Sequence, residues 1–253
     1  MTITRAIARL PASNAAQGLT TAALGAPDMA LMLAQHGEYV RMLEALGIEV
    51  TVLEPDERYP DSCFVEDTAV VTSAVAVVTR PGAPSRRGEE AAIEPLLAKH
   101  RAIARIEAPG TVDGGDVLVL GERALIGLSA RTNADGAEQL AGILGEHGMR
   151  CTTLEVGGGL HLKSSINALG EYRLLVTPEF SEHPELGTFE RVVVPCEETY
   201  AGNSLWVNDH VIVPAGFPAT RALIERLGTT TIEADVSEFR KMDGGLTCLS
   251  IRF

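Results

Sequence analysis

The residues best suited to chemistry recur along the chain at a nearly constant interval. Counted from the first, successive members are 47, 48, 42 and 45 residues apart. If the chain is built from repeated units, these side chains occupy similar places in successive units and converge on one axis. Together they would supply a nucleophile, a base, a group that orients the base, and acids that bind a cation. The members are Glu66-Asp67, Asp113, His161, Asn203 and Cys248.

Each of these residues also has an ordinary structural explanation. A lone cysteine such as Cys248 is more commonly buried and inert than nucleophilic. His161 follows the glycine run 157–159, which lets the backbone approach a ligand closely, yet it could equally be a hydrogen-bonded structural histidine. Residues 113–116 (Asp-Gly-Gly-Asp) fit a turn or a metal-binding loop, although the spaced acids of an EF-hand are missing. Glu66-Asp67 could simply lie exposed at a strand end.

The elements that would position this set recur in a fixed order. Two short apolar strands, an amphipathic helix and a further strand follow one another four times. The expected strands are 69–72, 75–79 and 103–106; 116–120, 124–128 and 151–156; 165–169, 172–176 and 191–194; and 204–207, 211–213 and 229–233. The expected helices are 89–100, 133–147, 180–187 (the most weakly marked) and 218–227.

The two ends of the chain together predict a fifth unit. Strands are expected at 3–9, 48–53 and 249–253, and a helix at 28–46 that Gly47 can stop. Five units of about 50 residues each are typical of a closed radial array, which pairing of the terminal strands would complete. An ordinary doubly wound sheet explains the strand–helix alternation equally well on pattern alone.

Composition limits the class of protein and its partners. The 253 residues are 45% hydrophobic and 22% charged, which excludes a disordered chain or a coiled coil, and no Pro/Ser-rich linker marks a domain boundary. The net charge of −13 argues against nucleic-acid and anionic-membrane partners and suits a small cationic substrate. The N-terminus lacks a signal-peptide hydrophobic region, and the four cysteines form no Cys-x-x-Cys pair. We therefore expect a cytoplasmic protein with free thiols.

Six motifs, in order along nearly the whole chain, resemble the dimethylarginine dimethylaminohydrolase family. The resemblance implies the pentein fold, a five-bladed α/β propeller, as a single catalytic domain over residues 1–253. It implies hydrolysis of asymmetric dimethylarginine and monomethylarginine to L-citrulline plus dimethylamine or methylamine, with no metal or organic cofactor. It leaves the oligomeric state open between monomer and homodimer. The motifs are Asp61–Asp67, Thr79–Arg87, Asp113–Leu118, Gly127–Asn133, His161–Ser164 and Asp243–Cys248.

The same resemblance assigns the reacting groups. Cys248 is implied to be the nucleophile that forms a covalent thiouronium intermediate, because a thiolate both attacks and leaves well. His161 is implied to protonate the departing amine and then to activate water. Asp113 is implied to orient His161; the Asp-Gly pair here resembles animal members of the family, whereas bacterial relatives carry Glu-Ala. Two nearby carboxylates are expected to raise the pKa of the Cys248 thiol, and a bound guanidinium to lower it.

A second group of residues is implied to bind the substrate. Two carboxylates hold the guanidinium beside an aromatic ring, a further acid meets the α-amino group, and two arginines grip the α-carboxylate. A leucine forms part of a lid over the pocket, and a methionine contacts the substrate through its main chain or side chain. In that order the residues are Glu66 and Asp67, Phe64, Asp61, Arg86 and Arg131, Leu19, and Met242.

Three other functions compete with this interpretation. Arginine and agmatine deiminases share the chemistry but resemble longer chains, and arginine deiminases add a helical insertion for which this chain leaves no room. A non-catalytic guanidino-binding pentein would be expected to lack one of the reacting residues, and none is missing. A metal-binding protein that uses Cys248, His161 and Asp113 would bind zinc with the same side chains.

Overall fold

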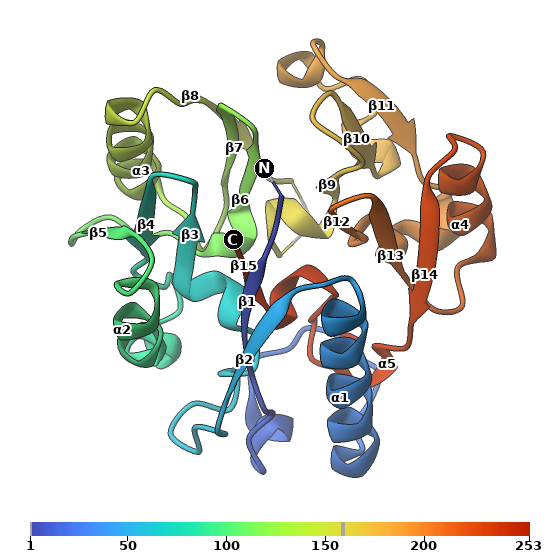
Figure 1. The fold of residues 1–253 in the computed structure, drawn as a ribbon, viewed down its shortest axis with the longest axis horizontal. Coiled ribbons are helices and arrows are strands. Elements are labelled where there is room, and N and C mark those ends of the chain that lie inside the picture. The colour runs from blue at the N-terminus through green and yellow to red at the C-terminus, as the bar shows by residue number, and fades with distance from the viewer. Residues whose placement is uncertain (1, 158–159) are drawn as a thin grey trace.

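The fold is a ring of small sheets around a common centre (Figure 1). The structure, a computed structural model, describes residues 2–157 and 160–253, so Gly158 and Gly159 of the predicted glycine run lie outside the described residues. Five three-stranded sheets are present in the described chain. They comprise β3 (Ala69–Val71), β4 (Val75–Val78) and β5 (Ala102–Arg105); β6 (Val117–Leu120), β7 (Arg123–Leu128) and β8 (Arg150–Glu155); β9 (Ile166–Ala168), β10 (Arg173–Val176) and β11 (Glu190–Val193); β12 (Leu205–Val207), β13 (His210–Pro214) and β14 (Thr230–Ala234); and β15 (Ile251–Arg252), β1 (Arg5–Arg9) and β2 (Glu49–Leu53).

Every sheet has the same connectivity. The first strand pairs antiparallel with the second, as in β6 and β7, where Val117 lies opposite Ile126. The second strand pairs parallel with the third, as in β7 and β8, where Arg123 lies opposite Arg150. A tight turn suffices for an antiparallel pair, whereas a parallel pair needs a crossover connection, and the helices lie in those crossovers. The predicted repeat is therefore confirmed.

The fifth sheet joins the two ends of the chain. In β1 and β15, Ala6 lies opposite Arg252 and Ile7 opposite Ile251, so that both termini meet near the centre of the ring (Figure 1). This antiparallel pairing closes the ring, as the terminal strands predicted. The alternative of a single doubly wound sheet is wrong, because the strands form five separate sheets instead of one.

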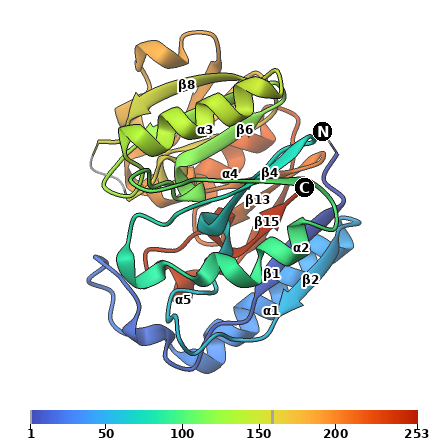
Figure 2. The ribbon, with the colours of Figure 1, turned by 90° about the vertical axis from the view of Figure 1, so that its left-hand side faces the viewer.

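The longer helices lie at the periphery, and α3, α2 and α1 follow one another along one flank (Figure 2). Helix α1 begins after Asp28, whose side chain accepts hydrogen bonds from the N–H groups of Ala30 and Leu31. Asn133 caps α3 in the same way. The helices are α1 (Met29–Ala45), α2 (Glu94–Leu97), α3 (Ala134–Glu146), α4 (Pro218–Glu225) and α5 (Ser237–Arg240). No described helix has both the length and the apolar character required to cross a membrane.

Two of the predicted helices are wrong in part, and proline accounts for both. The expected helix 180–187 is replaced by two 3-10 turns that begin at Pro178 and Pro184. Proline lacks an N–H and disfavours the helical conformation of the residue before it, so a continuous helix cannot pass position 184. The expected helix 89–100 is likewise divided into a 3-10 turn, Glu89–Ala92, and the single turn of α2, whose first turn contains Pro95.

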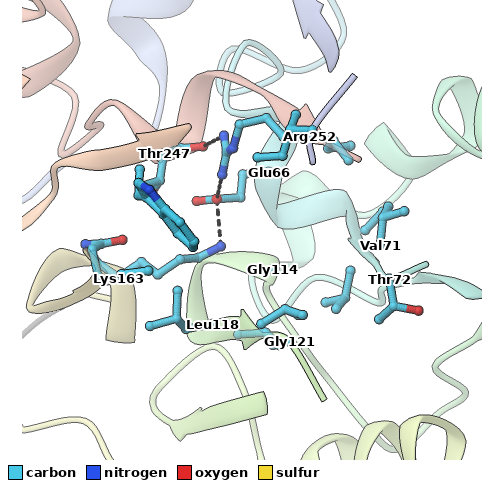
Figure 3. A pocket seen from close by; sticks show the side chains of 18 of the residues that line it. Glu66, Val71, Thr72, Gly114, Leu118, Gly121, Lys163, Thr247 and Arg252 are labelled. Atoms are coloured by element: carbon cyan, nitrogen blue, oxygen red, sulfur yellow. Dashed lines mark hydrogen bonds and ion pairs between the residues drawn. The ribbon is translucent and has the colours of Figure 1, made fainter. Parts of the chain in front are cut away.

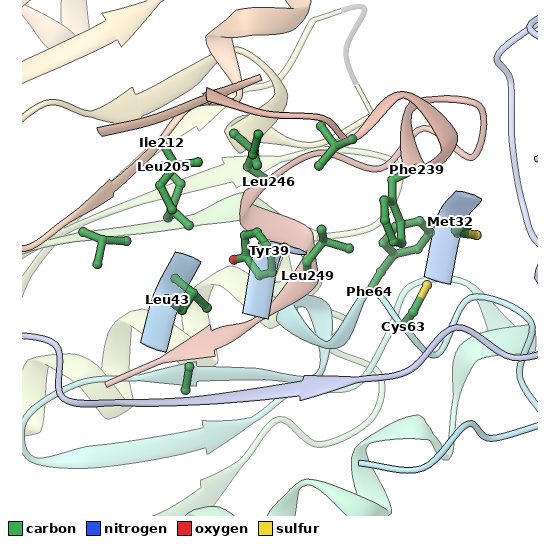
Figure 4. Packing of buried hydrophobic residues seen from close by; sticks show 14 of the residues in the cluster. Met32, Tyr39, Leu43, Cys63, Phe64, Leu205, Ile212, Phe239, Leu246 and Leu249 are labelled. Carbon is green, nitrogen blue, oxygen red and sulfur yellow. The ribbon is translucent and has the colours of Figure 1, made fainter. Parts of the chain in front are cut away.

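Helix α1 covers an apolar core that also supports the site (Figure 4). Its buried face includes Met32, Tyr39 and Leu43, which pack in one cluster with residues of the segment between β14 and β15. Leu246 and Leu249, on either side of Cys248, are fully buried in that cluster. Packed apolar side chains therefore hold the backbone around Cys248 in place.

His36, on the buried face of α1, predicts a loss of stability in acid. Burial lowers the pKa of His36 to about 4, opposed weakly by the nearby Arg9 main chain, and neither ring nitrogen has a hydrogen-bond partner among the described residues. A base with a lowered folded pKa stabilises the fold above its unfolded value, and that contribution falls between pH 6.5 and 4. We expect the free energy of unfolding, measured in urea, to fall by about 3 kcal/mol more between pH 6.5 and 4 in the parent protein than in His36→Leu. If the unfolding free energies of the two proteins depend equally on pH, the effect does not come from His36.

Candidate active site

The five predicted polar positions meet where each unit begins. A 3-10 turn precedes the innermost strand of every sheet, and successive turns contact one another around the centre. The expected convergence on one axis is confirmed. One member, Asn203, has a structural part: its side chain bonds to the Lys163 carbonyl at 2.8 Å and to the Thr247 N–H at 3.1 Å, which joins three units. The turns are Val65–Thr68, Gly114–Asp116, Leu162–Ser164, Cys196–Gly202 and Thr247–Leu249.

A pocket of about 170 Å³ opens at this convergence. The structure brings ten of the eleven predicted site residues to its wall; Glu66 is the exception. The ten are Leu19, Asp61, Phe64, Asp67, Arg86, Asp113, Arg131, His161, Met242 and Cys248. The sequence interpretation did not single out the other lining residues, Thr20, Thr21, Leu160, Asp243 and Gly244.

His161 is held by one acid and faces another. Its Nε2 lies 3.1 Å from Asp113 Oδ2 and 4.0 Å from Asp67 Oδ1. Burial lowers the pKa of His161, but Asp67, Asp113 and Asp116 together overcome burial and raise it above its ordinary value. The imidazole is therefore protonated at neutral pH, the form that a general acid requires. Asp113 is fully buried, and its other oxygen accepts the Gly82 N–H at 2.8 Å.

The His161 ring and the Asp67 carboxylate leave no room for a side chain at Gly115. A Cβ there would lie 2.7 Å from His161 Nδ1 and 2.8 Å from Asp67 Oδ1. The Gly115 N–H donates to that same Asp67 oxygen at 2.9 Å. Asp116, the last residue of the motif, accepts the Leu162 N–H at 2.9 Å and thereby fixes the residue after His161. The Asp-Gly-Gly-Asp motif thus positions the imidazole through Asp113, Gly115 and Asp116.

Asp67 lies on the pocket wall but already has a cationic partner. Its Oδ2 accepts from Arg86 Nη1 at 2.5 Å. Burial raises the pKa of Asp67, yet His161 and Arg86 outweigh burial and keep its pKa below the ordinary value, so the group is ionised. Arg86 also bonds Glu89, with Nη2 to Oε2 at 2.7 Å, and the Phe64 carbonyl at 2.9 Å. Most of the hydrogen-bonding groups of Arg86, which the resemblance assigns to the substrate carboxylate, are therefore already paired within the protein.

Arg131 differs from Arg86 although the resemblance gives both the same role. Its side chain is partly exposed, lines the pocket and has no ion-pair partner among residues 2–157 and 160–253. Asp61 lies on the same wall, and burial raises its pKa in spite of Arg86 and the Leu19 N–H. An arginine and an acid at one end of a pocket suit the carboxylate and amino group of an amino acid.

Cys248 lies in the turn Thr247–Leu249, with its Sγ 3.4 Å from the Gly245 N–H. Burial, then the charge of Glu66, then that of Asp67, raise the pKa of the thiol to about 12. This confirms the expectation that nearby carboxylates disfavour the thiolate. A cation bound beside those carboxylates would lower the pKa again, so a cationic substrate would help to form its own nucleophile.

A segment near the N-terminus covers the pocket. The Leu19 N–H donates to both Asp61 oxygens, at 3.0 and 3.2 Å, and its side chain is 42% exposed. Thr20 Oγ1 donates to the Lys241 carbonyl, and Thr21 Oγ1 donates to Asp243 Oδ2, each at 2.9 Å. Asp243 has a φ of 57°, in the left-handed region. Its place in the Asp-Gly-Gly motif was the only sequence signal for this contact.

Phe64 and Met242 both line the pocket, and their contact with a substrate stays a prediction. The Phe64 ring packs edge-on to Phe239, with ring centroids 6.2 Å apart, and a Cβ on Gly244 would come within 2.2 Å of it. Met242 is 4% exposed. The pocket lining therefore includes apolar as well as charged side chains.

The Glu66 side chain is placed differently from Asp67. It lines a second, larger cavity, where its Oε1 accepts from Lys163 Nζ at 2.6 Å and from Arg252 Nη2 at 2.8 Å. Its Oε2 is buried with no hydrogen-bond partner among the described residues. Contact between Glu66 and a guanidinium stays a prediction, with Oε2 as the available atom.

A different set of side chains from the predicted one lies close enough to share a metal ion. Ligand atoms of Asp67, Asp113 and His161 lie within 4.8 Å of one another, so Asp67 takes the place that the sequence gave to Cys248. Protonation of His161 and the bonds of both acids oppose such binding, because a metal requires a neutral imidazole and free carboxylate oxygens.

Comparison with known proteins identifies the family. A sequence model described as eukaryotic N,N dimethylarginine dimethylhydrolase matches residues 25–193. The N(G),N(G)-dimethylarginine dimethylaminohydrolase of Pseudomonas aeruginosa is 48% identical over 249 residues, which cover 98% of each chain. The chain belongs to the dimethylarginine dimethylaminohydrolase family. The enzyme of the same name from Streptomyces coelicolor is 37% identical, over 98% of this chain and 96% of its own.

The fold of this dimethylarginine dimethylaminohydrolase family member agrees with a solved relative. The Pseudomonas aeruginosa enzyme, as a cysteine-to-serine mutant complexed with citrulline, superimposes with a TM-score of 0.98 at 47% identity, with both chains fully covered. The fold is therefore the pentein fold that the family resemblance implied.

Proposed function

We propose that this protein hydrolyses asymmetric dimethylarginine and monomethylarginine to L-citrulline and dimethylamine or methylamine. The observation that carries the proposal is a single pocket in which Cys248, the His161–Asp113 pair and Asp67 surround one end. Arg131, which has no ion-pair partner among the described residues, and Asp61 suit the amino-acid end of the substrate. The family relatives of the same name, one of them complexed with citrulline, support this assignment.

The charges of the site suit the order of the steps. A guanidinium held beside Asp67 lowers the pKa of the Cys248 thiol, which loses its proton to solvent, and the thiolate adds to the central carbon. Protonated His161 gives its proton to the departing amine, and a thiouronium remains on Cys248. The imidazole, now neutral, takes a proton from water as the water oxygen adds to the same carbon. Collapse of that adduct releases citrulline and the thiolate. No step uses a metal or an organic cofactor.

The substrate panel separates this function from that of a deiminase. The leaving nitrogen of a methylated substrate needs apolar room, whereas a deiminase binds both N–H groups of that nitrogen. A methyl group in an apolar pocket is worth only about 1–3 kcal/mol, but unpaired buried polar groups reject a substrate far more strongly. We expect asymmetric dimethylarginine and monomethylarginine to give the highest kcat/KM. Symmetric dimethylarginine, which is methylated on both terminal nitrogens, and unmodified arginine should react poorly. Agmatine should react least because it has no carboxylate for Arg131.

The measurement is release of citrulline and dimethylamine in competition assays with these five compounds, with Cys248→Ser protein as the blank. A higher kcat/KM for arginine than for asymmetric dimethylarginine would favour the deiminase. Binding of methylarginine without release of either product would favour the non-catalytic pentein.

Three further properties stay predictions. We propose that residues 1–253 act as one catalytic domain, which a single cooperative transition in calorimetry would support. A cytoplasmic location is tested by cell fractionation. Light scattering decides between a monomer and a homodimer.

A further inference from the structure

A second cavity lies between the innermost strands of all five sheets (Figure 3). This central cavity has a volume of about 340 Å³, twice that of the reactive pocket, and its wall includes residues of β3, β6, β9, β12 and β15. Neither Cys248 nor His161 lines it. The charged side chains on its wall that are not exposed are Glu66, Lys163 and Arg252, whereas Glu122 and Glu171 are exposed.

These three side chains form one buried ionic cluster. Figure 3 shows the Glu66 carboxylate between Lys163 and Arg252, and both cations donate to the same oxygen, Oε1. Glu66 is 3% exposed and Lys163 8%. A buried carboxylate is stable as an anion only when cations or hydrogen-bond donors compensate for the lost water. Two cations donate to Glu66 Oε1, while Oε2 makes no hydrogen bond to a described residue.

The cluster also touches the nucleophile. After burial, the charge of Glu66 does most to raise the pKa of the Cys248 thiol, and the charge of Lys163 lowers it. Arg252 Nη1 donates to the carbonyl of Thr247, the residue before Cys248, at 2.9 Å, and to the Ser250 carbonyl at 2.6 Å. The arginine therefore connects both ends of the nucleophile turn to Glu66.

We infer that Lys163 and Arg252 are positioning residues for the hydrolysis, acting from the central cavity. They hold the Glu66 carboxylate in place beside the nucleophile turn, and Arg252 fixes the turn that carries Cys248. This inference rests on the proposed function. It gives the larger cavity a part in the reaction without assigning it a ligand.

Lys163 is tested with a neutral and a charged replacement. Lys163→Met leaves the charge of Glu66 less compensated, so the thiolate of Cys248 becomes harder to form. We expect its alkylation by iodoacetamide, followed at the Cys248 peptide by mass spectrometry from roughly pH 6 to 10, to shift to higher pH. A shift of one pH unit would lower the rate about tenfold at a given pH. Lys163→Arg should restore the parent profile, and Lys163→Gln gives a second neutral variant if the methionine variant does not fold.

Steady-state kinetics tests the link through Glu66. Lys163→Met should lower kcat/KM for asymmetric dimethylarginine about tenfold or more, and should have a much smaller effect in a Glu66→Gln background. Arg252→Met should act in the same direction, with partial recovery in Arg252→Lys. Lys99→Met, which removes an exposed lysine far along the chain from the cluster, is the matched control and should behave as the parent.

The two experiments separate failure of the inference from failure of the proposed function. Parent protein that releases no citrulline overturns the proposed function, whereas the alkylation profiles, which need no substrate, still test Lys163. If folded Lys163→Met shows the alkylation profile and kcat/KM of the parent, the inference is wrong.

Discussion

Replacing Cys248 with serine is expected to lower turnover of asymmetric dimethylarginine by a factor on the order of 10⁴ or more, as in other enzymes that lose a covalent nucleophile. A serine hydroxyl is far less acidic than a thiol, and the burial and carboxylates that already raise the thiol pKa to about 12 would oppose an alkoxide even more. The change replaces a single sulfur whose hydrogen-bond partners among the described residues are the Gly245 N–H and the Thr247 hydroxyl, so the fold should persist.

The matched control for this prediction is Cys196→Ser, which alters an exposed cysteine and should retain parent activity. Parent protein quenched during turnover should carry an adduct on the Cys248 peptide in mass spectra. Appreciable turnover by the Cys248→Ser protein, or an adduct on another cysteine, would rule out the thiolate mechanism. His161→Ala should be similarly inactive, because the departing amine would lose its proton donor.

Arg86→Ala is expected to destabilise the protein by about 3–5 kcal/mol, the usual cost of leaving buried charges without their partner. Arg86 is 5% exposed and pairs with both Asp67 and Glu89, which are also buried. Its loss would remove the buried cation that pairs with Asp67 and with Glu89. Unfolding in urea, with activity measured on the fraction that folds, checks the prediction.

Arg131→Ala is the matched comparison, since the family resemblance assigns both arginines to the substrate carboxylate. Arg131 has no ion-pair partner among the described residues, so its removal should change stability by less than about 0.5 kcal/mol. It should instead cost about 2–5 kcal/mol in substrate binding, a rise in KM of about 30-fold or more. Equal losses of stability in the two variants would contradict the distinction.

Sequence patterns predicted five repeated units and, if these close into a ring, the meeting of their polar residues. The family resemblance then favoured the ring over a doubly wound sheet. Strand and helix periodicity are local properties, and a similar polar residue at the start of each unit is brought to the centre by the repeat itself. Convergence of Asp67, Asp113, His161 and Cys248 on one pocket therefore needed no knowledge of side-chain packing. The helices expected at 89–100 and 180–187 were the exceptions, because prolines within them outweigh the apolar spacing.

Only the tertiary structure decided which charged groups pair. Glu66 and Asp67 are adjacent in the sequence, yet Glu66 turns to Lys163 and Arg252 in the central cavity, and Asp67 faces His161 in the reactive pocket. The partners come from units up to 186 residues away along the chain. A buried charge takes the nearest compensating group in space, and that group depends on how the units pack around the ring. Residue type and spacing therefore determined which groups could meet, and packing determined which of them do.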